Sequence, residues 1–71
     1  MNYKPDTNEL IVTDVIRHLN RVGDRATAGE ITSYARLSFK DVKHTLRKMR
    51  KWEHAAFDEA KGWTLTEEKK S

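Results

Sequence analysis

Two helix-start signals lie close together in the middle of the chain and limit how it can fold. Thr27 opens the first signal and Ser38 opens the second, and each is followed three positions later by an acid. In such a capping box the hydroxyl oxygen accepts an amide of the first helical turn while the acid bonds back to the cap. We expect only three residues between the two helices, so that they cross steeply instead of packing antiparallel.

A longer helix is predicted before these signals. From residue 6 or 7 onward, apolar residues recur at intervals of three and four, which is the spacing of one helix face. Gly23 is expected to end this helix, because glycine readily adopts the conformation that closes a helix. The expected core face consists of Ile11, Val15, Leu19 and Val22, widened by Val12 and Ile16.

The two later helices show shorter apolar stripes. Ile31 and Ala35 are expected to face inward from the helix that Thr27 opens. The third helix is predicted over about residues 38–54, and its apolar positions recur at helical spacing. Its inward face is expected to comprise Val42, Leu46, Met49 and then Trp52 or Glu53.

After His54 the apolar period changes from 3.6 to two, which indicates β-structure. Residues 55–57 and 63–66 form two short segments, and the loop 58–62 between them ends in a glycine. This pattern predicts a β-hairpin. Because an isolated hairpin is marginal in water, Phe57, Trp63 and Leu65 are expected to pack on the helices. The expected fold class is therefore mainly α with a small β-hairpin.

The size of the chain argues for one domain and against an enzyme. With 71 residues and no cysteine, it has one small core and no disulfide to reinforce it. We expect a single domain over residues 1–71, ordered over about 7–66, with short solvated tails. The acids are scattered and match no catalytic motif, and the three histidines show no metal-ligand spacing. No catalytic residue, metal, cofactor or small-molecule ligand is therefore expected, and without a membrane span or export signal the expected location is the cytoplasm.

The positive charge is concentrated on the third helix. The whole chain carries a net charge of +3, but residues 38–54 hold six basic and two acidic residues, a balance of +4. At about 100° per residue, the basic positions lie roughly opposite the stripe that begins at Val42. The basic stripe consists of Lys40, Lys43, His44, Arg47 and Lys51.

Such a stripe favours DNA binding, although other readings stay open. Lysine and arginine neutralise phosphates, and arginine also bonds to the guanine edge in the major groove. A merely solvated helix would more often alternate charges. An acidic protein partner is the alternative occupant of the stripe, since fold does not fix function. A homodimer is also possible through the first helix, where Leu10, Val12 and Ile16 lie partly off the core stripe.

The stretch from Thr27 to Val42, continuing to Leu46 and Met49, resembles the winged helix-turn-helix domains of bacterial, archaeal and phage DNA-binding proteins. It is similar to their pattern T-x-x-E-I-A-x-x-x-G-L-S-x-x-x-V-x-x-x-L-x-x-L, and residues 62–66 resemble the second strand of a wing. The likeness covers about residues 7–66. It implies a three-helix winged helix-turn-helix whose third helix, about 38–54, docks in the major groove. The implied function is sequence-specific binding of double-stranded DNA, as in a small transcriptional regulator.

The resemblance also implies which residues contact DNA. Ser38 and Thr27, at helix starts, are expected near phosphates. Lys43 and Arg47 are the candidates for base contacts. The wing loop, which contains Lys61, is implied to touch the DNA backbone or the minor groove. The positions that usually face DNA in the family are occupied here by Phe39, Lys40, Lys43, His44 and Arg47. Phosphate contacts are expected from Lys40, Arg50 and Lys51.

Three departures from the family pattern stand out. Arg36 replaces the glycine of the turn, so a non-glycine residue is expected in a left-handed or otherwise strained conformation. Thr32 replaces the small third residue of the second helix. The wing loop 58–62 contains two acids and only one lysine, so it would repel phosphate more than attract it.

Overall fold

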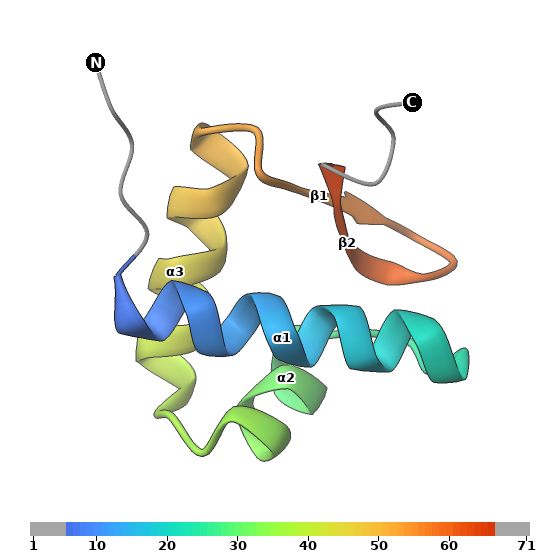
Figure 1. The fold of residues 1–71 in the computed structure, drawn as a ribbon, viewed down its shortest axis with the longest axis horizontal. Helices are drawn as coiled ribbons and strands as arrows, with labels where there is room; N and C mark the ends of the chain where they lie inside the picture. The colour runs from blue at the N-terminus through green and yellow to red at the C-terminus, as the bar shows by residue number, and fades with distance from the viewer. Residues whose placement is uncertain (1–5, 67–71) are drawn as a thin grey trace.

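A computed structural model describes residues 6–66 as three helices followed by an antiparallel hairpin (Figure 1). This is the mainly helical layout of a winged helix-turn-helix, as predicted. The expected tails, residues 1–5 and 67–71, lie outside the described residues. The elements are α1 (Thr7–Val22), α2 (Ala28–Ala35), α3 (Phe39–Lys51), β1 (Ala55–Asp58) and β2 (Gly62–Leu65).

Each helix begins at a residue whose side-chain oxygen accepts an amide of the first turn. These bonds satisfy donors that have no partner inside the helix. The first box is not reciprocal, because the backbone amide of Thr27 donates to the carbonyl of Arg25 instead of to an acid. The oxygen–nitrogen distances are 2.8 Å for Asp6 with Glu9, 3.1 Å for Thr27 with Glu30 and 3.0 Å for Ser38 with Asp41.

Three residues connect α2 to α3, as expected. Arg36 ends α2 in the left-handed conformation, with φ of 62°, and its amide donates to the Thr32 carbonyl at 3.1 Å. An L-residue in this region costs about 1–2 kcal/mol. Leu37 follows and packs against the core, so burial of its side chain offsets the cost of the turn.

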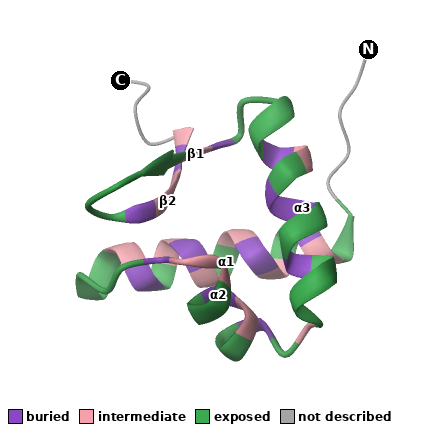
Figure 2. Cartoon of the chain, turned by 180° about the vertical axis from the view of Figure 1, so that it is seen from behind, coloured by how far each residue is buried: buried purple, intermediate pink, exposed green. Residues whose placement is uncertain are grey.

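The core lies where the three helices meet beneath the hairpin (Figure 2). The inward stripe predicted for α2 is confirmed, and that of α3 is confirmed for Val42, Leu46 and Met49 but not for Trp52 or Glu53. Three further residues close the core from the hairpin side: Ala26, Ala55 and Leu65. The largest fully buried side chains are Val12, Ile16, Leu19, Ile31, Val42, Leu46 and Met49.

The core face predicted for α1 is confirmed in part: Val12, Ile16 and Leu19 are buried and Val15 packs against them. The buried stripe follows Val12, Ile16 and Leu19, whereas Val22 is 54% exposed in the last turn. Apolar residues occupy two adjacent stripes of this helix, and spacing alone does not decide which one turns inward. Since Val12 and Ile16 are fully buried, Leu10 is the one exposed residue of the three proposed for a dimer contact.

The third helix is shorter than predicted. It ends at Lys51, followed by Trp52 as its cap and Glu53 with φ of 62°. The amide of His54 then donates to the Met49 carbonyl at 2.8 Å, which closes the helix end. Trp52 is 47% exposed and therefore does not extend the core face.

The hairpin is anchored to the loop between α1 and α2. Phe57 lies opposite Trp63 in the antiparallel pair. On its other side β2 pairs with Ala26, whose amide donates to the Lys61 carbonyl at 2.9 Å and whose carbonyl accepts the Trp63 amide at 2.8 Å. Asn20 of α1 adds a side-chain bond to the Trp63 carbonyl at 3.2 Å. Ala26 therefore acts as a one-residue third strand.

Gly62→Ala is expected to destabilise the fold by about 3 kcal/mol. Gly62 has φ of +80°, and a Cβ there would lie 2.5 Å from the Ala26 carbonyl oxygen. Gly29→Ala is the matched control, because its added Cβ meets no atom within 4 Å and alanine favours a helix. Urea unfolding followed by circular dichroism measures both free energies. Equal stability of the two variants would contradict the anchoring role of Gly62.

Candidate nucleic-acid interface

The outward face of α3 presents the predicted basic residues together. Each one lies on the side away from the core, and Figure 2 shows this face of α3 as mainly exposed. The helix has this orientation because Val42, Leu46 and Met49 hold its opposite side in the core. The exposed basic residues, here called the α3 stripe, are Lys40, Lys43, His44, Arg47, Arg50 and Lys51.

The cations of the α3 stripe are not neutralised within the part of the chain that the structure describes. Over residues 6–66, none of its lysines and arginines forms an ion pair with a carboxylate. Lys43 extends over the ring of Phe39, with its Nζ 5.3 Å from the ring centroid, which is a cation–π contact. Phe39 is itself 50% exposed, so this pair lies at the edge of the stripe. The stripe therefore carries its full positive charge toward solvent.

Lys48 differs from the other basic residues of α3. Its Nζ lies 2.8 Å from Asp6 Oδ2 and 3.8 Å from Glu9 Oε1, so it ties α3 to the start of α1. The hydrogen bond from Lys48 lowers the pKa of the Asp6 carboxyl, and the Glu9 amide acts in the same direction. The same bond with Asp6 raises the pKa of the Lys48 ammonium group. The charge of Lys48 is therefore paired with carboxylates of the fold and is not part of the α3 stripe.

Ser38 and Thr27 stand at the starts of α3 and α2. Each hydroxyl oxygen accepts a backbone amide, which is a capping role. A hydroxyl that accepts one bond retains its own proton as a donor. Ser38 is exposed and Thr27 is half-buried, so both caps remain compatible with the expected phosphate contacts.

The tip of the hairpin is acidic, as its sequence indicated. Asp58 Oδ2 accepts the backbone amide of Lys61 at 3.0 Å, which folds the loop back on itself. Arg25 Nε donates to the Glu59 carbonyl at 3.0 Å. Lys61 is exposed, but it is accompanied by two carboxylates within four residues. The structure therefore places the one wing lysine beside acids, at a distance in sequence and space from the α3 stripe.

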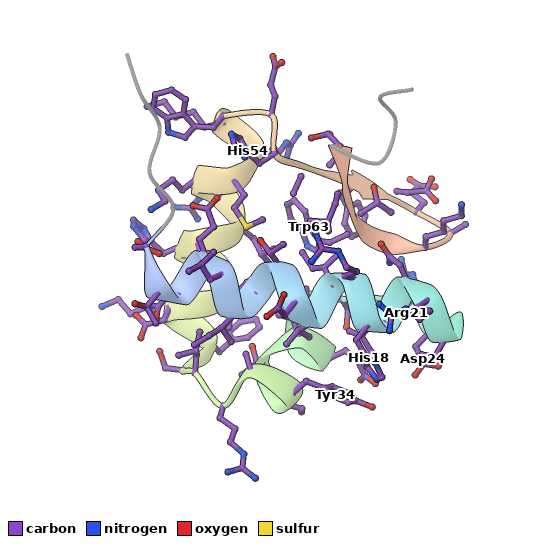
Figure 3. The ribbon with its side chains drawn as sticks, in the orientation of Figure 1. His18, Arg21, Asp24, Tyr34, His54 and Trp63 are labelled. Carbon is purple, nitrogen blue, oxygen red and sulfur yellow. The ribbon has the colours of Figure 1, made fainter. Side chains whose placement is uncertain are left out.

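An open groove separates the hairpin from the end of α3 and the start of α2. Arg50 brings the α3 stripe to its edge, and Arg25, for which the sequence analysis predicted no role, contributes a second cation from the loop between α1 and α2. Figure 3 shows Trp63 between the hairpin and α1, and His54 where the chain leaves α3. The lining includes Arg25, Thr27, Arg50, His54, Phe57 and Trp63.

The face formed by α1 and α2 has a different character. The rings of His18 and Tyr34 lie 5.9 Å apart between these helices (Figure 3). His18 is exposed on α1. Arg21 and Asp24 lie at the end of α1, away from the α3 stripe. Within residues 6–66, no three histidine or acidic side chains cluster as metal ligands.

Comparison with known proteins identified no relative of this chain. No family model, curated protein or solved structure matches the chain. Over the described residues, no helix combines the length and the apolar character that a membrane crossing requires. Membership of the winged helix-turn-helix family therefore stays a proposal, which the residues and the geometry support.

Asp6→Asn is expected to reduce the loss of stability in acid. Since the folded-state pKa of Asp6 is lowered, its stabilising effect is present above the unfolded pKa and disappears as pH falls below about 4. Asparagine caps a helix as well as aspartate does, so the variant removes mainly the ion pair with Lys48. Thermal unfolding between pH 7 and pH 2 should show a smaller drop in Tm for the variant. An identical drop in both proteins would contradict this role.

Proposed function

We propose that this protein binds double-stranded DNA sequence-specifically, as a small transcriptional regulator of the winged helix-turn-helix family. The observation that carries the proposal is the α3 stripe, in which solvent-facing cations on one helix face have no carboxylate partner over residues 6–66. A face of one charge sign orients a protein toward a polyanion before contact.

The dimensions of α3 suit the major groove. A helix of 13 residues is about 20 Å long and about 10–12 Å wide with its side chains, and the groove is about 12 Å wide. In this arrangement Lys43 and Arg47 reach base edges, since they are exposed and lie near the middle of the length of α3. Around the helix axis, Phe39 and His44 lie on either side of this pair. Phosphates are contacted by Lys40, Arg50 and Lys51. The hydroxyls of Thr27 and Ser38 also lie near phosphates.

The acidic hairpin tip limits the role of the wing. Two carboxylates beside Lys61 disfavour close approach of that loop to phosphates. The proposed contact with DNA therefore depends mainly on α3 and the start of α2. In this proposal the protein regulates transcription by occupying DNA, and the cytoplasm is its proposed location.

Arg47→Ala is expected to cost about 1–3 kcal/mol of binding free energy at a cognate site, because it removes a base contact. On a generic duplex, the double variant Lys43→Glu with Arg47→Glu should abolish binding. Lys51→Ala should weaken binding to all sequences and reduce the slope of log K against log salt by about one. Fluorescence anisotropy at two salt concentrations measures all three effects.

Arg21→Glu is the matched control, since Arg21 is an exposed arginine on α1 and outside the stripe. It changes the net charge as one stripe reversal does, so it should retain most of the duplex affinity. Absence of binding at low salt, or an equal loss in the control and the stripe variants, would overturn the proposal. Binding of an acidic protein without binding of duplex would assign the stripe to an adaptor.

A further inference from the structure

The groove beside the hairpin carries an aromatic surface that the proposed duplex contact does not use. Alternate residues of a strand face the same side, so Phe57 shares the inner face of β1 with buried Ala55. Contrary to the prediction that it packs on the helices, Phe57 is 48% exposed and lies outside the core, while its partner Trp63 packs against the core. The two rings meet edge to face with centroids 5.6 Å apart. One wall of the groove is therefore a half-exposed aromatic pair.

This aromatic wall is held rigidly. The backbone bonds of Ala26 to Lys61 and Trp63 fix β2 against the loop before α2. Arg25 adds a bond to the Glu59 carbonyl on the other side of the hairpin loop. A surface positioned by several independent bonds loses little conformational freedom when a ligand binds.

The charge of the groove complements an anion. Arg25 and Arg50 both line it, against a single carboxylate from Glu53. Arg50 also belongs to the α3 stripe, so a polyanion lying along α3 continues into the groove without interruption. The ligand suited to this groove combines negative charge with a flat apolar face.

We propose that this groove binds an unpaired DNA strand next to the duplex held by α3. Arg25 and Arg50 hold its phosphates, and a base packs on the exposed ring of Phe57. Stacking on aromatic side chains and electrostatic contact with the backbone are the two means by which proteins hold single strands. The inference rests on the proposed function, because the strand enters the groove from the same DNA.

The position of Phe57 decides against insertion into an intact duplex. A side chain that wedges between base pairs must project from the protein surface, whereas Phe57 lies on the inner side of the hairpin. The acidic loop 58–61 extends beyond it and would meet the phosphates first. The bases of an intact duplex are stacked and do not reach the groove, so the exposed ring suits a base that has left the stack.

Intrinsic fluorescence provides a direct test. Both tryptophans of the chain line the groove. Trp52→Phe keeps an aromatic ring at that position and leaves Trp63 as the reporter. Titration with the single-stranded oligonucleotide (dT)12 at low salt should quench Trp63. Phe57→Ala and Phe57→Leu should each weaken this binding about tenfold or more, because both remove the ring. Phe57→Leu retains an apolar side chain, and circular dichroism melting confirms that it folds.

Tyr34→Ala is the matched control, since Tyr34 is similarly exposed but lies against α1. It should leave (dT)12 binding unchanged, and Phe57→Leu should leave blunt-duplex binding nearly unchanged. Absence of (dT)12 binding, equal quenching by polyglutamate, or an equal effect of Phe57→Leu on both DNAs would overturn the inference. Binding of (dT)12 without duplex binding would overturn the proposed function alone, and duplex binding without (dT)12 binding would overturn the inference alone.

Discussion

The close approach of Gly62 to Ala26 is the contact on which the arrangement of the whole molecule depends. It attaches the hairpin to the loop between α1 and α2, and Leu65 then closes the core from that side. A hairpin of two four-residue strands is marginally stable at best on its own, so it depends on this contact to hold its place. The groove exists for the same reason, because the contact fixes the distance between the hairpin and the start of α2.

The cations of α3 have two different roles. Lys48 faces the start of α1, where it bonds to Asp6 and approaches Glu9, and it serves the fold. Lys43 and Arg47 lie on the opposite flank, with no carboxylate partner among residues 6–66. The spacing of side chains around the helix determines these roles. If α3 were rotated about its axis by the angle between two successive residues, a different side chain would contact α1. The stripe proposed to meet DNA is therefore a consequence of how α3 is packed.

Much of the fold could be predicted because its signals are local. The caps Thr27 and Ser38, the stop at Gly23 and the change of period after His54 each depend on a few neighbouring residues. The incorrect predictions concern features that are determined by tertiary contacts. Spacing did not distinguish the two apolar stripes of α1, and nothing near Glu53 indicated that it would turn left-handed. The stripe on α3 was predicted, whereas the groove was not, because Arg25 and Phe57 meet only after folding.

The three-residue connection between α2 and α3 has a consequence for how this sequence can vary. One inserted residue at positions 36–38 would rotate α3 by about 100° about its axis, which would bring Asp41 toward the core and expose Val42. The identity of these residues is less restricted, as Arg36 in a left-handed conformation demonstrates. In homologous chains we therefore expect length changes to accumulate in the loop 58–61, while the connection between the two helices keeps its length.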